Sequence, residues 1–231
     1  MTSLYTVLLI NPNTSTWVTD KLASHLRTML GATMRIDGVT ARFGASYIDS
    51  QPSFDTGAEA VLDVWSRHRA DSARNPPDAV LIGCFGDPGL QALCAAAAPV
   101  PVLGLAQAAV GEAHRAGRYA IVTGGIAWKP MLTRIVEDFG WQDRLDNITV
   151  IEQSGADLAD DPERALRLLA AACCEAAAPG VERVVLGGAG FAGYGDALRD
   201  QVPVPVIDSV SAAARALLTL RAPGRHDAPA R

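Results

Sequence analysis

Several features that mark other classes of protein are missing from this chain of 231 residues. It has no run of roughly 18 apolar residues, so no transmembrane helix is expected. Only 19% of its residues are charged and its net charge is −5, which provides no basic surface for nucleic acid. Residues 1–5 carry no basic group ahead of an apolar run, so no signal peptide is expected.

Cysteine and histidine are also scarce, with four residues of each type. Neither type shows the spacing of a zinc site, and four cysteines form no disulfide framework in a chain of this length. The cysteines are Cys84, Cys94, Cys173 and Cys174. The sequence therefore predicts a reduced, metal-free, cytoplasmic protein without a nucleic-acid or membrane partner.

The chain does contain a regular alternation of β-rich and helical patterns, and 49% of its residues are hydrophobic. The predicted strands are 5–10, 34–41, 79–83, 100–103, 119–123, 148–152, 183–187 and 204–207. The predicted helices are 14–30, 56–70, 88–96, 107–116, 129–139, 162–177, 192–198 and 210–220. This alternation predicts parallel βαβ units wrapped by helices, followed by a frayed tail at 223–231.

The chain also contains an internal duplication. The apolar run that ends at Cys84 is repeated before Gly188, and Pro-Val-Pro-Val follows both runs at an offset of 104 residues. We expect an α/β fold of two similar flavodoxin-like lobes, each with a four-stranded parallel sheet, related by a pseudo-twofold axis. Lobe 1 is predicted to span 1–100 plus 208–231, and lobe 2 to span 101–207.

Ligands of such sheets bind beyond the carboxyl ends of the strands, so we expect the active site in the cleft between the lobes. Asn11, Cys84, Thr123 and Gly188 follow predicted strands directly. The duplication therefore places a thiol on one side of the predicted cleft and a glycine on the other.

Cys84 is the first candidate for chemistry. Asp87-Pro88-Gly89 is typical of a helix N-cap with proline at the first helical position. A cysteine just before a helix N-terminus is favoured as thiolate, and the free N–H groups there bind anions. The alternative is a small buried apolar residue, which is the prediction for the other three cysteines, in alanine-rich helical stretches.

Other residues near the predicted strand ends could bind substrate. The Asn11 amide could donate to a carboxylate, although Asn13 or Thr14 beside it could simply cap the next helix. Tyr47 and Gln51 lie in a predicted loop of the kind that often covers a cleft. The remaining candidates supply backbone N–H groups, a hydroxyl or an aromatic wall, and are Phe85, Gly86, Thr123, Gly124, Trp128, Ala189 and Gly190.

The segment from Gly188 to Gly193 matches G-x-G-x-x-G, with Asp208 further on. We reject a dinucleotide site, because the chain ends soon after Asp208 and no full crossover helix fits before the strand at 204. The glycines are better interpreted as a loop of close approach to a small anion.

Two motifs resemble those of a known family. The segments 9–15 (Leu-Ile-Asn-Pro-Asn-Thr-Ser) and 83–90 (Gly-Cys-Phe-Gly-Asp-Pro-Gly-Leu) resemble the hydantoin and allantoin racemase branch of the Asp/Glu/hydantoin racemase superfamily. The resemblance implies cofactor-independent chemistry at a carbon beside a carboxylate or amide carbonyl, with two cysteines on opposite faces of the substrate. It gives Cys84 the role of the first cysteine.

The same resemblance implies anion binding by Asn11, Thr123 and the N–H groups of 85–86 and 189–190. The chain departs from the pattern where the second cysteine is expected, because Gly188 stands there. Gln107 and Gly124 are further departures, where glutamate and threonine are expected. Tyr194 and Asp208 are candidate replacement acids by sequence proximity alone.

Three functions follow from these observations. The first is a racemase or isomerase that moves a proton through Cys84. The second is a one-cysteine decarboxylase of the arylmalonate decarboxylase type, which protonates an enolate from one face. The third is a non-catalytic binder of small carboxylates. The expected partner is a small carboxylate or cyclic amide, and the resemblance implies a homo-oligomer.

Overall fold

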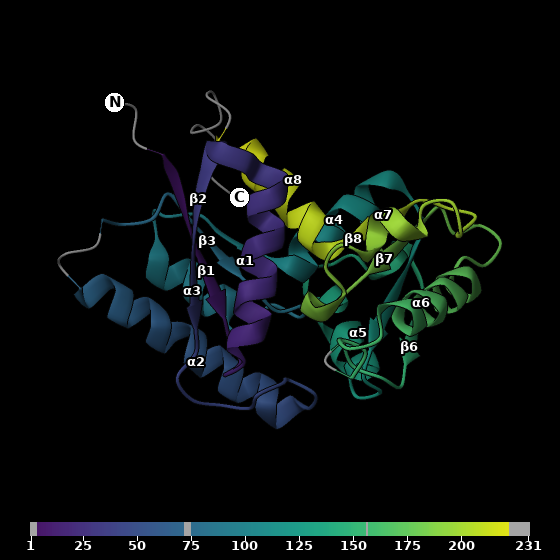
Figure 1. Ribbon diagram of the computed structural model, residues 1–231, viewed down its shortest axis with the longest axis horizontal. Helices are drawn as coiled ribbons and strands as arrows, with labels where there is room; N and C mark the ends of the chain where they lie inside the picture. Colours follow the sequence, from purple (N-terminus) through teal and green to yellow (C-terminus); the bar gives the residue numbers. More distant parts are fainter. Residues whose placement is uncertain (1–3, 72–74, 156, 222–231) are drawn as a thin grey trace.

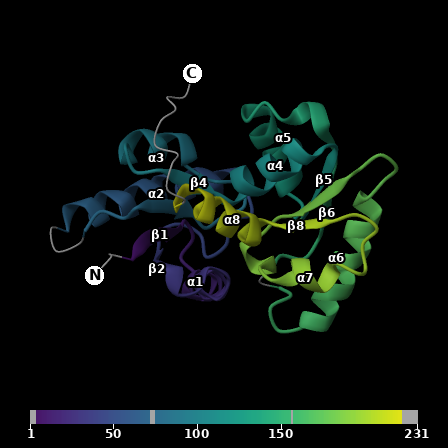
Figure 2. The same ribbon diagram turned by 90° about the horizontal axis from the view of Figure 1, so that it is seen from above.

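The computed structural model describes residues 4–71, 75–155 and 157–221. The predicted tail and the last ten residues of predicted lobe 1 lie outside the described residues, as do residues 1–3, 72–74 and 156. The described chain forms two parallel sheets that lie side by side with helices around them (Figures 1 and 2). The predicted α/β class is confirmed.

Each sheet has four strands in the same order. The first has the order β2-β1-β3-β4 and the second β6-β5-β7-β8, and every pairing is parallel. The strands are β1 (Tyr5–Asn11), β2 (Met34–Thr40), β3 (Ala79–Ile82), β4 (Val102–Gly104), β5 (Tyr119–Gly124), β6 (Leu145–Ile151), β7 (Arg183–Leu186) and β8 (Val206–Asp208). The identical order is the one that a duplicated chain requires.

In the part of the chain that the structure describes, eight α-helices connect and cover these strands. They are α1 (Thr16–Leu30), α2 (Gln51–Ala70), α3 (Leu90–Ala97), α4 (Leu105–Ala116), α5 (Trp128–Asp138), α6 (Pro162–Ala176), α7 (Tyr194–Leu198) and α8 (Ser209–Arg221). A short 3-10 turn, η3 (Ala189–Phe191), follows β7.

Most of the described helices begin within two residues of the predicted start, and the start of α2 differs most. Helix α2 starts five residues before 56, because Ser50 and Ser53 form a capping box and a proline follows in the first turn. Gln51 therefore belongs to a helix rather than to a loop. Helix α3 starts later than predicted, at Leu90, with Gly89 as its N-cap in a left-handed conformation.

One of three buried hydrophobic clusters joins the two halves. Helices α4 and α8 pack against each other between the sheets (Figure 2). A single cluster of buried residues runs through both halves and includes Leu9, Leu105, Ile121, Val185 and Val210. Strand β4 falls in the range predicted for lobe 2 yet pairs with β3, so the first sheet extends past residue 100. The division into lobes stays a prediction.

Candidate active site

A small enclosed cavity lies where strands from both sheets end. Its volume is about 30 Å³, which is room for only a few water molecules. The cavity is lined by Asn13, Trp17, Val18, Tyr47, Ile48, Gly83, Cys84, Phe85, Thr123, Trp128, Gly188, Ala189 and Gly190. It therefore brings together most of the candidates from the sequence, including Cys84 after β3 and Gly188 after β7.

Cys84 lies in a tight turn rather than at a helix N-terminus. Its carbonyl accepts the Asp87 N–H at 3.1 Å, and Gly86 and Asp87 both have positive φ. The residue is 8% exposed, and burial together with the nearby Asp87 carboxyl raises the pKa of the thiol above its ordinary value. The resting thiol is thus protonated at neutral pH. The thiolate expected from the sequence is disfavoured, because burial and the Asp87 carboxyl both oppose ionisation of the thiol.

Asp87 caps a different helix from the one predicted. Its carboxylate accepts the N–H groups of Ala106 at 3.0 Å and Gln107 at 2.7 Å, at the start of α4. A Cβ at Gly104 would overlap this carboxylate, so only glycine leaves the space. Burial raises the pKa of Asp87 to about 7, against the opposing effect of the backbone hydrogen bonds.

In the second half, helix α8 corresponds to α4, and its cap comes from a residue that does not correspond to Asp87. Asp208, which lies 104 residues after Gly104, accepts the N–H groups of Val210 at 2.9 Å and Ser211 at 3.0 Å at the start of α8. The Gly193 N–H also donates to Asp208 at 2.9 Å. Asp208 is therefore occupied as a cap, and neither it nor Tyr194 is among the residues that line the cavity.

Asn11 organises the loop after β1 and does not line the cavity. Its buried amide donates to the Asn13 Oδ1 at 2.9 Å, to the Ser15 carbonyl at 2.9 Å and to the Thr19 hydroxyl at 3.0 Å. Asn13, two residues on, reaches the cavity wall instead. Asn13 rather than Asn11 therefore lines the cavity, and the binding of substrate by Asn11 stays a prediction.

Tyr47 and Thr123 are the hydroxyl-bearing residues that line the cavity, and they come from different halves. Burial and the proximity of Cys84 raise the pKa of Tyr47 to about 12, so its phenol stays protonated. Thr123 ends β5 and is buried. Cys84 and Tyr47 are the two titratable side chains among the described residues that line the cavity.

The turn after β7 is built for close packing. Gly188 has a φ of +137°, and a Cβ there would lie 2.9 Å from Phe191 Cδ2. A Cβ on Gly190 would lie 2.7 Å from the Cα of Gly155. The Gly-rich segment forms a 3-10 turn and the five-residue helix α7, so it has no crossover helix of the kind that a dinucleotide site needs.

Gly86, Gly124 and Gln107, which the sequence also singled out, lie outside the cavity as well. Gly86 lines a neighbouring chamber. Gly124 packs under Phe191, and Gln107 is partly buried with its side-chain oxygen unpartnered in the described structure.

Sequence reasoning missed Lys21, whose half-buried ammonium donates to the Gly190 carbonyl at 2.6 Å. No motif marks this residue, because its role depends on how α1 meets the turn after β7.

Within the ranges that the structure describes, no three His, Cys, Asp or Glu side chains gather in a way that could hold a metal ion. No helix in those ranges combines the length and hydropathy that crossing a membrane requires.

Comparisons with known proteins agree with the fold. The chain is 34% identical over 220 residues to a hydantoin racemase from Paenarthrobacter aurescens, covering 94% of this chain and 92% of that one. The structure matches an allantoin racemase from Pseudomonas fluorescens with a TM-score of 0.84 and 26% identity, covering 93% and 90% of the two chains. An allantoin racemase from Klebsiella pneumoniae matches with a TM-score of 0.82 and 28% identity, covering 94% and 87%.

The sequence model of one family matches almost the whole described chain. The match is to the Asp/Glu/Hydantoin racemase family and runs from residue 7 to residue 217, which includes both sheets, the Cys84 turn and the Gly188 turn. The chain therefore belongs to the Asp/Glu/hydantoin racemase family.

Proposed function

We propose that this protein is a cofactor-independent enzyme in which Cys84 transfers a proton at a carbon alpha to a carbonyl group. The proposed substrate is a hydantoin-like cyclic amide, in keeping with the similarity to hydantoin racemases. The observation that carries the proposal is the buried Cys84 thiol in a cavity that both duplicated turns line. A buried acid–base group in a small cleft is the arrangement that proton transfer at carbon needs.

The raised pKa of the thiol fits this chemistry. A carbon acid beside a carbonyl loses its proton only to a strong base, and a poorly solvated thiolate is a stronger base than an exposed one. The resting thiol first gives up its own proton to solvent, and the thiolate then removes the α-proton. As the C–H bond breaks, its electron pair moves onto the carbonyl oxygen and the proton resides on sulfur. The neutral thiol can then return that proton to the carbon.

The enolate-like intermediate needs hydrogen-bond donors at its oxygen. We assign this role to the Thr123 hydroxyl and to backbone N–H groups of the two turns, at Phe85 and at 189–190. These groups line the same cavity as the thiol. In a buried site such donors stabilise developing charge more strongly than they would in water.

Racemisation also requires a proton carrier on the second face. Gly188 has no side chain, so we assign this role to Tyr47, the other titratable group that lines the cavity. The pKa values of both groups are raised, so each group in its ionised form is a stronger base than it would be in water. The alternative is a one-face reaction such as decarboxylation, which Gly188 favours because that reaction needs Cys84 alone.

Incubation with hydantoins, allantoin and amino acids in deuterium oxide tests the proposal. Deuterium at the α-carbon with inversion is the expected result, and Tyr47→Phe should retain exchange while losing inversion. Exchange with retained configuration, or carbon dioxide release from disubstituted malonates, would support the one-face reaction. Binding of these compounds without exchange or carbon dioxide release would contradict both and leave a non-catalytic binder.

A further inference from the structure

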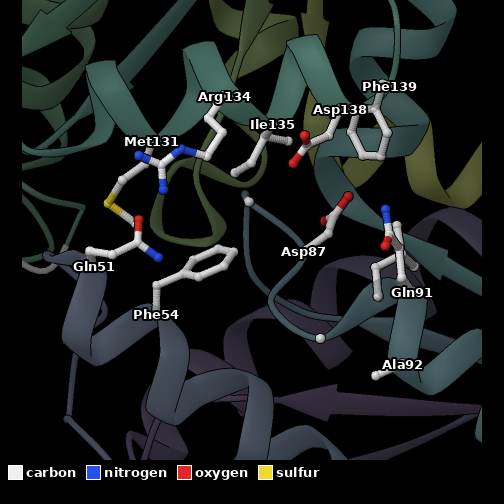
Figure 3. Close-up of a pocket in the computed structure, with 13 residues that line it drawn as sticks. Gln51, Phe54, Asp87, Gln91, Ala92, Met131, Arg134, Ile135, Asp138 and Phe139 are labelled. Atoms are coloured by element: carbon white, nitrogen blue, oxygen red, sulfur yellow. The ribbon is translucent and has the colours of Figure 1, made fainter.

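The Cys84 cavity is too small for a cyclic amide, but a larger chamber lies beside it. The chamber has a volume of about 380 Å³, within the range of roughly 300–1,000 Å³ that is usual for small-molecule sites. Helix α2, the turn at 86–89 and helix α3 form one side, and α5 forms the other (Figure 3). Gly86, two residues after Cys84, belongs to the chamber wall.

The side chains of Phe54 and Trp128 separate the Cys84 cavity from the chamber, and we call this pair the partition. Trp128 of α5 lines the cavity, Phe54 of α2 lines the chamber, and their rings meet edge to face with centroids 6.3 Å apart. A Cβ on Gly86 would lie 2.5 Å from Trp128 Cζ3 and 3.2 Å from Phe54 Cε2. The glycine therefore lets both rings close over the turn that carries the thiol.

The chamber is mainly apolar, with polar groups at its edges. Apolar side chains come from Phe54, Leu90, Met131, Ile135 and Phe139. Figure 3 shows Arg134 and Gln51 on one side of the chamber and Asp138 on another, and the Asp87 carboxylate at its edge is bonded to the start of α4. Such a space binds an apolar group several atoms long rather than a charged one.

We propose that this chamber receives the substituent of the reacting carbon, and that Phe54 and Trp128 determine substrate specificity. This inference rests on the proposed function of the Cys84 site. When the Trp128 ring moves off Phe54, cavity and chamber become one space, with the ring of the substrate against Cys84 and its substituent between α3 and α5. The preferred substrates then carry an apolar substituent several atoms long, such as a benzyl group.

Two variants change the chamber in opposite directions without touching the proton-transfer groups. Ala92→Trp adds an indole from an exposed position of α3 that borders the chamber, and Ala95→Trp is the matched control on the same helix, outside the lining. Phe54→Ala removes half of the partition. Each variant is tested with 5-methylhydantoin and 5-benzylhydantoin. Turnover is measured in the chain that carries only that substitution. Binding is measured by calorimetry in a chain that also carries Cys84→Ala.

Ala92→Trp should weaken binding and turnover of 5-benzylhydantoin by about tenfold or more and leave 5-methylhydantoin nearly unchanged, since lost room for even one methylene costs roughly 10–200-fold. Phe54→Ala should shift the preference toward 5-benzylhydantoin. Equal effects of Ala92→Trp and Ala95→Trp on both compounds would overturn the chamber assignment. Absence of turnover with either compound would contradict the proposed function, whereas the binding arm would still decide the chamber.

Discussion

Gly188 has a backbone conformation that residues with a Cβ rarely adopt. A Cβ at this position would also lie too close to the ring of Phe191. Gly188→Ala should lower the free energy of unfolding by about 1–3 kcal/mol, because left-handed strain adds to the overlap with Phe191. Urea denaturation measures the change. Gly180→Ala is the control, since φ there is +93° but no atom lies within 4 Å of a Cβ. Equal losses in both variants would show that the contact with Phe191 has no effect.

The sequence predicted the site best where the duplication marked it. Cys84 and Gly188 could be paired from the offset alone, and both line the cavity. Asn11 could not be distinguished from Asn13, because which amide turns inward depends on hydrogen bonds to Ser15 and Thr19. The sequence did not predict that the thiol is protonated, because the burial of Cys84 and its proximity to the Asp87 carboxyl depend on the tertiary structure.

At the scale of elements, Asp87 links the Cys84 turn to helix α4. Its pKa rises from an ordinary value of 3.8 to about 7 on folding, so the unfolded chain loses this proton at lower pH than the folded one. The contribution of the protonated Asp87 carboxyl to the free energy of unfolding is therefore complete below about pH 4, and it is lost as the pH rises through about 7. Over that window this group lowers the free energy of unfolding by up to about 1.4 kcal/mol per pH unit.

Asp87→Asn should remove this pH dependence, which chemical denaturation between pH 5 and 8 measures. Asp160→Asn, an exposed change, should leave the wild-type slope in place. A slope that persists unchanged in Asp87→Asn would show that another group is responsible.

The sequence located most strands and helices within a few residues, yet it assigned Asp87 to α3 because a local capping pattern cannot reveal a partner helix that starts at 105.

At the scale of the whole molecule, Lys21 joins the two halves across the cavity wall. Its ammonium donates to Gly190 and lies 5.0 Å from the ring centroid of Trp17, so it holds two lining residues in place. Lys21→Met should lower the free energy of unfolding by about 1 kcal/mol and raise KM more than it lowers kcat. Denaturation and steady-state kinetics measure both, with the exposed Lys129→Met as control. Unchanged KM in Lys21→Met would contradict this role.

The duplication predicted two sheets of equal order, and both are present. It did not predict that they share a core, where α4 packs on α8 and Arg215 binds Glu112 through two hydrogen bonds of 2.9 and 3.0 Å. Such contacts join residues about a hundred positions apart, and a single sequence carries no signal for which helix faces meet.

The central claim is that the Cys84 thiol moves the proton, and hydrogen–deuterium exchange at the α-carbon of a hydantoin tests it most directly. Cys84→Ala should slow the enzyme-dependent exchange by about 10²–10⁴-fold, as expected for loss of an acid–base group. Cys94→Ala, which removes an exposed thiol on α3, should leave the rate unchanged. Exchange that survives in Cys84→Ala at the wild-type rate, or falls equally in both variants, would contradict the account.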